Sequence, residues 1–207
     1  MIEDTPLQRF LDELASPSST PGGGSAAAIM GAMGAALVSM VCNLTVGKKN
    51  YEEVGEVMAK TLKQSEALRA RLIGLVQADI RAFDAVMAAY GLPRQTDGEK
   101  QERSRRIQDA LKGATDAPLE CAQACADLIA LSRVVAEQGN RNVVSDAGVA
   151  VMAAHAALRS AALNVQVNAK VIKDAEFVAQ ATARLESILA GVGNESEAIF
   201  QLVWEKL

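Results

Sequence analysis

The stretch from Pro21 to Val46 reads "PGGGSAAAIMGAMGAALVSMVCNLTV". Three consecutive glycines stand directly before residues 25–46, which carry no charged side chain. A bilayer span needs about 20 apolar residues, so the segment is long enough either for a membrane span or for a helix buried in a soluble protein. The glycines could form a phosphate loop, a hinge before such a span, or the mouth of a binding site built on a buried helix.

The composition of residues 25–46 favours the buried helix. The segment consists mostly of Ala, Gly, Ser and Met, which insert into bilayers weakly compared with Leu, Ile and Phe, and Asn43 adds a polar amide near its end. Ala27, Gly31 and Ala35 recur every four residues, which lays a ridge of small side chains along one helix face. We therefore expect a core helix in close contact with its neighbours, and no membrane insertion.

The rest of the chain is helical by pattern. Beside residues 25–46, the expected helices cover about 5–15, 51–90, 99–112, 118–137, 145–171, 174–190 and 194–206. Thr5 and Pro6 mark the first start, Pro118 is expected to open a new helix, and Ser145 is a candidate N-cap. We find no strand pattern, internal repeat or domain linker. The sequence predicts one all-α domain over residues 1–207, a helical bundle with long helices.

Composition limits the partners and the compartment. The net charge of −4 provides no basic surface for nucleic acid. Three cysteines are an odd number, which argues against a disulfide framework, and the acidic N-terminus "MIEDTPLQRF" does not resemble a signal peptide. We expect a cytoplasmic protein. The cysteines and the single histidine, His155, lack the spacing of a zinc site, so no metal is expected.

The glycine turn fits neither common nucleotide motif. A Walker loop needs a preceding strand and a lysine at fixed spacing, and a dinucleotide fingerprint needs different glycine spacing. Free backbone N–H groups at the start of a helix do attract carboxylate or phosphate, and Ser25 could cap that start. Gly22, Gly23 and Gly24 therefore have two open interpretations: a ligand-binding turn, or a tight turn crossed by another helix.

Three blocks carry a resemblance to a known family. They are "TPGGGSAAAIMGAMGAALVSMVCNLTVGKKNY" from residue 20, "ADIRAFDAVMAAYGLP" from residue 78 and "GNRNVVSDAGVAVMAAHAALRSAALNV" from residue 139. In this order and spacing they resemble the cyclodeaminase family of folate enzymes, to which the C-terminal half of formiminotransferase-cyclodeaminase belongs. "MVCNLTVGKK", "MAAYGLP" and "SDAGVAVM" are most similar to the stand-alone methenyltetrahydrofolate cyclohydrolases of methylotrophs.

The resemblance implies an all-helical homodimer that binds folate in a groove and uses no metal, nucleotide or prosthetic group. The implied reaction interconverts 5,10-methenyltetrahydrofolate and 10-formyltetrahydrofolate by hydration and ring opening. The alternative is formimidoyltetrahydrofolate cyclodeamination, a ring closure that releases ammonia. A further alternative is a helical bundle that kept the fold and lost the chemistry.

Asp79 is the candidate general base. It lies in a helix lined by apolar neighbours, where a carboxylate has a raised proton affinity, although a solvated helix residue is the plain alternative. The family block D-x-x-A-F matches at Asp79, Ala82 and Phe83, which favours the functional interpretation. Asp84 is a weaker candidate because it lies on another face of the same helix.

The remaining candidates follow from the resemblance. Lys48 and Asn43 are expected near the reacting carbon with Asp79; the alternative for the lysine and its neighbour Lys49 is an interaction with the helix dipole. Lys49 is expected to contact folate, while Asp146 would grip the pterin or only stabilise a helix start. Asn164 lies 18 residues after Asp146, roughly 27 Å along the helix, so the two would serve different ends of the ligand or opposite subunits. Further residues expected to line the folate site are Pro21, Gly22, Gly23, Gly24, Ser25 and Ser145.

Overall fold

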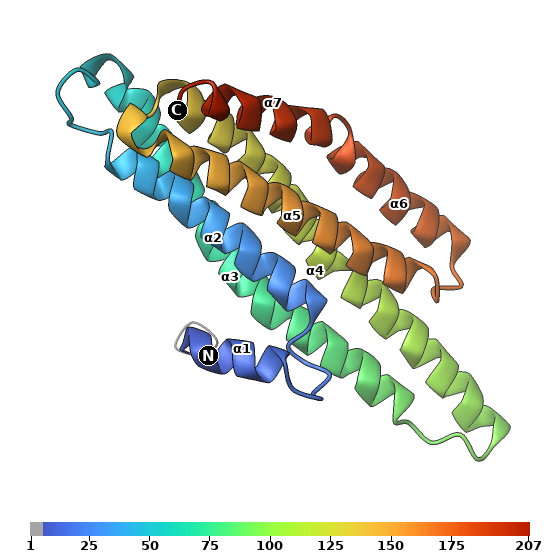
Figure 1. The fold of residues 1–207 in the computed structure, drawn as a ribbon. Helices are drawn as coiled ribbons and strands as arrows, with labels where there is room; N and C mark the ends of the chain where they lie inside the picture. The colour runs from blue at the N-terminus through green and yellow to red at the C-terminus, as the bar shows by residue number, and fades with distance from the viewer. Residues whose placement is uncertain (1–5) are drawn as a thin grey trace.

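The computed structural model describes residues 6–207 as seven α-helices and two short 3₁₀ helices, with no strand in that range (Figure 1). The α-helices are α1 (Leu7–Leu14), α2 (Gly23–Asn43), α3 (Gly55–Tyr90), α4 (Asp97–Gln138), α5 (Val144–Ala169), α6 (Ala175–Leu189) and α7 (Val192–Trp204). The 3₁₀ helices η2 (Glu52–Val54) and η3 (Arg141–Val143) precede α3 and α5. The all-α prediction is confirmed. The start expected at Thr5 lies outside the described residues, and Pro6 is the N-cap of α1.

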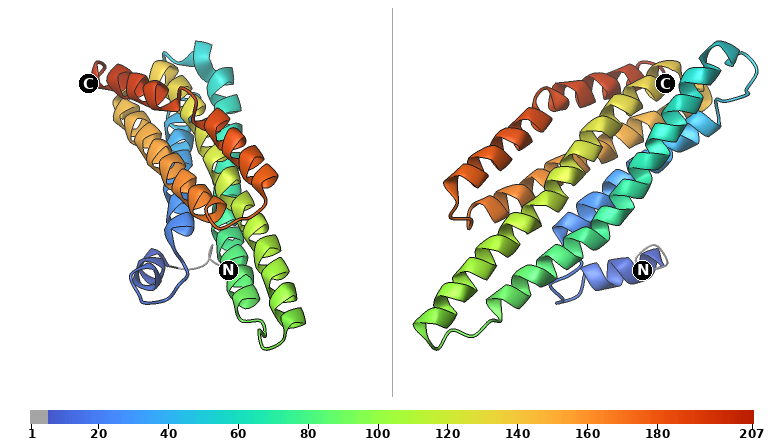
Figure 2. Two further views of the ribbon diagram at one scale, coloured as in Figure 1. Left: turned by 90° about the vertical axis from the view of Figure 1, so that its right-hand side faces the viewer. Right: turned by 180° about the vertical axis from the view of Figure 1, so that it is seen from behind.

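Four long helices form the body of the molecule. Helix α2 packs against α3 and α5, and α4 contacts all three of these helices. Helices α6 and α7 run along α4 and α5, while the short helix α1 lies near the start of α2 (Figure 2). Because α2 and α5 run antiparallel, the start of α2 lies beside the end of α5.

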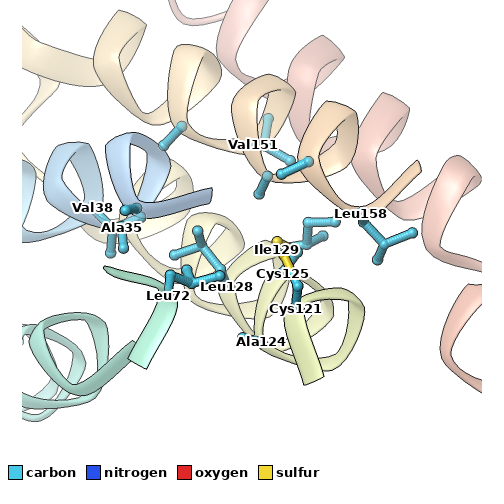
Figure 3. Close-up of a cluster of buried hydrophobic side chains, with 14 of the residues drawn as sticks. Ala35, Val38, Leu72, Cys121, Ala124, Cys125, Leu128, Ile129, Val151 and Leu158 are labelled. Atoms are coloured by element: carbon cyan, nitrogen blue, oxygen red, sulfur yellow. The ribbon is translucent and has the colours of Figure 1, made fainter. Parts of the chain in front are cut away.

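Small residues let these helices approach closely. Ala27 and Ala35 are completely buried on α2. A methyl group added at Gly31 would stand 3.0 Å from the Cys125 sulfur, and one added at Gly34 would stand 3.0 Å from the Ala150 carbonyl oxygen. The tight packing predicted from the four-residue spacing is therefore confirmed. The side chains of α2, α3, α4 and α5 meet in one cluster, part of which is drawn in Figure 3.

Pro118 was expected to begin a helix, and this prediction is wrong. The proline lies inside the continuous helix α4, which runs from Asp97 to Gln138. Proline has no N–H, so it leaves the carbonyl oxygen of Ala114, four residues earlier, without its usual helical donor. The side chain of Asn168 on α5 donates to this oxygen over 2.9 Å. A neighbouring helix thus supplies the missing hydrogen bond, and α4 continues through the proline.

Two expected N-caps are also wrong. Gly22 is the N-cap of α2, so Ser25 is the third helical residue and its hydroxyl is free to face another helix. Val143 is the N-cap of α5, and Ser145 is exposed inside the first turn. In both cases the helix begins earlier than the polar residue that suggested a cap.

Two helical segments are long and apolar enough to cross a membrane by length and composition, Gly23–Asn43 and Arg141–Ala169. More than half of the first and nearly half of the second are buried inside the bundle. Core helices of soluble proteins have the same properties, so this finding alone is weak support for a membrane span.

Candidate active site at the start of helix α2

A crevice of about 250 Å³ opens where the start of α2 meets α3, α4 and the end of α5. It joins the loop before α2 to three helices that are distant in sequence. Its lining residues are Ser19, Thr20, Gly22, Gly23, Gly24, Asp79, Ala82, Phe83, Val86, Ala114, Pro118, Asn164, Val167 and Asn168. The predicted glycine turn, Asp79 and Asn164 are therefore brought together. Pro21, also predicted, is buried beside them and follows a cis peptide bond.

Asp79 is held by the first turn of α2. The Ser25 hydroxyl donates to Oδ2 of Asp79 over 2.8 Å. Gly24 makes this approach possible, because a methyl group at Gly24 would stand 2.6 Å from Cγ of Asp79. A methyl group added at Gly23 would lie 3.8 Å from the Asn164 amide nitrogen, its nearest neighbour, which is an ordinary contact distance. None of the glycines in this turn has a positive φ, so Gly24 is required for close approach rather than for backbone conformation.

The crevice perturbs the protonation of Asp79. Burial raises the pKa of the carboxyl group above its ordinary value, and the hydrogen bonds from Ser25 offset part of that rise. The direction agrees with the proton affinity predicted from the apolar neighbours of Asp79. Among the described lining residues of this crevice, Asp79 is the only one with an ionisable side chain.

Two asparagines of α5 complete the polar lining. The Asn164 amide donates to the Ser160 carbonyl oxygen over 2.9 Å, and the Asn168 amide donates to Ala114 as described above. One hydrogen of each NH₂ group is thus occupied by a backbone carbonyl, and each amide oxygen remains available as an acceptor. Asn168 was not among the predicted site residues. The available signal was its position four residues after Asn164, on the same helix face.

The other predicted residues lie at the opposite end of the α2–α5 pair. Asn43 is the last residue of α2, about 27 Å along the helix axis from Ser25, and Lys48 and Lys49 follow it. Ser145 and Asp146 occupy the first turn of α5 at the same end. We call these residues (Asn43, Lys48, Lys49, Ser145 and Asp146) the distal group. Within one chain, the distal group and Asp79 cannot contact the same reacting carbon.

Hydrogen bonds tie the chain beside the distal group to the segment before α5. Asn140, just before α5, donates from its side chain to the Leu44 carbonyl oxygen and from its backbone to the Thr45 hydroxyl, both over 2.9 Å. The Lys48 ammonium lies 6.0 Å from the centre of the Tyr51 ring. Asn43, the last residue of α2, is exposed.

No cluster of three or more potential metal ligands occurs within residues 6–207. His155 is half-buried on α5 outside the crevice lining, and the three cysteines are free and buried. Cys121 lines a smaller chamber of about 10 Å³ next to Asp79.

The crevice can bind a group rich in hydrogen-bond donors or positively charged, and it can accept a proton from it. Asp79 supplies a carboxylate, and the two asparagines supply acceptor oxygens. The first turn of α2 directs its donors at this carboxylate, so a phosphate at the same place would meet a negative charge. This arrangement argues against a phosphate loop and favours proton transfer in a partly desolvated site.

Comparison with known proteins identifies the family. The formiminotransferase-cyclodeaminase family model matches residues 6–187. The chain belongs to this family. The resemblance seen in the three sequence blocks is therefore confirmed. The match covers the crevice, its glycine turn and the distal group.

Individual relatives agree with this assignment. The chain is 55% identical to the methenyltetrahydrofolate cyclohydrolase of Methylorubrum extorquens over the full length of both proteins. It is 38% identical to the formimidoyltransferase-cyclodeaminase of Sus scrofa, a match that covers 89% of this chain and 34% of the relative. The crystal structure of formiminotetrahydrofolate cyclodeaminase from Thermotoga maritima superimposes with a TM-score of 0.85 at 34% identity, over 100% of this chain and 98% of that one.

Proposed function

We propose that this family member is a methenyltetrahydrofolate cyclohydrolase, which hydrates 5,10-methenyltetrahydrofolate and opens the ring to 10-formyltetrahydrofolate. The observation that carries the proposal is the 55% identity over both full lengths to a protein of that name. The crevice supports it, because a single buried carboxylate without a competing cation suits a positively charged amidinium substrate.

Asp79 acts as the general base in this proposal. Water adds to the carbon between N5 and N10 while the carboxylate takes one of its protons, which gives a neutral tetrahedral intermediate. The protonated Asp79 then returns its proton to N5 as the bond from the carbon to N5 breaks. The hydroxyl group loses its proton to solvent and becomes the formyl oxygen on N10, so one proton is released overall. A raised pKa makes Asp79 suited to both steps.

The size of the crevice limits what one chain can enclose. Its 250 Å³ lies just below the usual range for small-molecule pockets, about 300–1,000 Å³. We propose that it holds the pterin and the reacting carbon, with the remainder of the tetrahydrofolate derivative outside it. The substrate-binding group in this proposal consists of the crevice residues Gly22, Gly23, Gly24 and Asn164, together with the adjacent Pro21. No prosthetic group takes part.

Substrate preference tests the assignment. We expect hydrolysis of 5,10-methenyltetrahydrofolate to be at least about tenfold faster than deamination of 5-formiminotetrahydrofolate, a difference of about 1.4 kcal/mol in barrier. The purified protein is assayed by loss of the near-ultraviolet absorbance of the methenyl compound and by release of ammonia. Faster deamination would assign the cyclodeaminase activity that the Thermotoga maritima relative carries in its name. Absence of both reactions would leave a non-catalytic bundle.

We further propose that the protein is a homodimer. Helices α2 and α5 expose apolar side chains on neighbouring outer surfaces, and α2 contains no charged residue. We call this surface the α2–α5 face; its large exposed members are Met33, Val149, Met152, Leu163 and Val167. Large apolar side chains exposed on adjacent helices are typical of a protein–protein interface.

A two-fold axis through the middle of this face would bring opposite ends of the two chains together. The distal group of one copy would then lie near the crevice of the other, since each runs along the same pair of antiparallel helices. In this arrangement, the distal group of one copy and Asp79 of the other copy belong to one folate site. The arrangement also accounts for the absence of a cation from the described lining of the crevice.

Disrupting the α2–α5 face tests the dimer. We expect the Leu163→Lys protein to be monomeric at micromolar concentration, because Leu163 is 69% exposed in one chain and a buried lysine would lack a partner. Light scattering gives the mass, and circular dichroism checks that helix content is retained. The control is Val57→Lys, an exposed apolar position on α3 outside this face, which leaves the dimer intact. A parent protein that is monomeric at this concentration contradicts the proposal.

The proposal also includes a cytoplasmic location without nucleic-acid or membrane partners, which the negative net charge and the burial of α2 support. It further includes a single domain over residues 1–207, which is supported by a core cluster with members from all seven α-helices.

A further inference from the structure

We propose that Ser25 is a positioning residue, which fixes the Asp79 carboxyl group at the crevice and favours its charged form. The inference rests on the proposed role of Asp79 as general base, and it changes the role of Ser25 from substrate contact to support for that base. The geometry of three neighbouring groups carries it: the Ser25 hydroxyl, the first turn of α2 and Gly24.

The Ser25 hydroxyl is committed to Asp79. A serine hydroxyl has one proton to donate, and here it is donated to Oδ2 of Asp79 over 2.8 Å. Ser25 is completely buried, so solvent does not compete for this proton. A hydroxyl in this state cannot donate to a ligand as well. Its function at the site is therefore exerted through the carboxylate.

The first turn of α2 strengthens this contact. Ser25 is the third residue after the N-cap, where a backbone N–H has no partner inside the helix, and its N–H faces the same carboxylate. The positive end of the helix dipole also points toward Asp79. Gly24 lets the carboxyl group approach this turn, since any side chain there would overlap it.

No other charged group among the described lining residues competes for control of Asp79. The neighbours from α3 are Leu75, Ala82 and Phe83; those from α4 are Ala117, Pro118 and Cys121; those from α5 are Ala161, Asn164 and Asn168. Only Cys121 among them is titratable. Removing the Ser25 hydroxyl should therefore act directly on the protonation of Asp79. Because the hydrogen bond favours the carboxylate, its loss moves the Asp79 titration to higher pH.

The experiment compares Ser25→Ala with Ser39→Ala in the full-length protein. Ser39 is a suitable control because it is also a buried serine on α2, and its hydroxyl pairs with that of Ser65 over 2.8 Å, away from the crevice. Aspartate labelled with ¹³C at Cγ reports the titration by NMR, and Asp79→Asn assigns the signal. The pH dependence of kcat/KM is measured on the same proteins.

We expect the Asp79 midpoint to move to higher pH in Ser25→Ala and to remain at the parental value in Ser39→Ala. On the acid side of the profile, we compare kcat/KM divided by its plateau value for each protein. This ratio should be at least about threefold smaller for Ser25→Ala than for the parent, as expected when a hydrogen bond to a charged group is lost. The Ser25→Thr protein, which retains the hydroxyl, should have the same Asp79 midpoint as the parent.

Each result decides a different statement. An unchanged Asp79 midpoint in Ser25→Ala overturns the inference, whatever the activity. A moved midpoint with an unchanged pH profile also overturns it, because Asp79 would then titrate without controlling the reaction. A parent protein that does not hydrolyse 5,10-methenyltetrahydrofolate removes the proposed function, while the NMR titration still decides whether Ser25 sets the charge of Asp79.

Discussion

The Asp79→Asn protein is expected to hydrolyse 5,10-methenyltetrahydrofolate about 10²–10⁴-fold more slowly than the parent, with unchanged helix content. Asparagine has nearly the size of aspartate and can still accept from Ser25, so the contact with the first turn of α2 is kept. The change removes only the ionisable oxygen that takes the proton from water. Steady-state kinetics and the melting temperature, measured on the same preparation, separate loss of chemistry from loss of folding.

Asp84→Asn is the matched control for this experiment. Asp84 lies five residues further along α3, is exposed, and does not line the crevice. The same chemical change there should leave turnover within about twofold of the parent, as is usual for surface positions. A stable Asp79→Asn protein with turnover within a few-fold of the parent would refute the general-base assignment. Proton transfer would then involve Asp146 of a second copy, or water and the substrate alone.

The Gly24→Ala protein is expected to lose about 10–10² in kcat with little change in melting temperature. The added methyl group would overlap the Asp79 carboxyl group, whose Cγ would be 2.6 Å away. A side-chain carboxyl group can rotate away at low cost to folding, but it then leaves Ser25 and the reacting carbon. Displacement of a catalytic group by about 1 Å is sufficient for a rate loss of this order.

Gly74→Ala provides the comparison for Gly24→Ala. Gly74 is an exposed glycine inside α3, the helix that carries Asp79, and nothing lies within 4 Å of an added methyl group. Alanine there should stabilise the helix by up to about 1 kcal/mol and leave kcat unchanged. If the two substitutions had the same effect on kcat, steric displacement of Asp79 would be excluded as the cause.

The sequence predicted the helical content because long stretches of this chain obey the helical period. The uncharged segment after "PGGG" could be assigned to the core since its small residues recur every four positions, and the structure places them against α3, α4 and α5. The break expected at Pro118 was wrong for a tertiary reason. The donor that rescues α4 is Asn168, which lies 50 residues further along the chain, and local patterns contain no information about such a pairing.

The site was predicted less completely than the fold. Asp79 and the glycine turn could be found because an acidic residue among apolar neighbours and a run of glycines are unusual in a helical sequence. The true partner of Ser25 could not be found, because a serine near a helix start suggests an N-cap and its contact with α3 depends on packing. Helix length alone already separates Lys48 from Ser25, since each helical residue adds about 1.5 Å.

The hydrogen bond from Asn168 to the Ala114 carbonyl also fixes the register of two helices. If α5 slid along α4 by one helical turn, about 5.4 Å, the part-buried carbonyl freed by Pro118 would lose the donor that Asn168 supplies. Pro118 and Asn168 thus favour one alignment of α4 with α5. Both residues line the crevice, where a shift in register would separate Asn164 from Asp79.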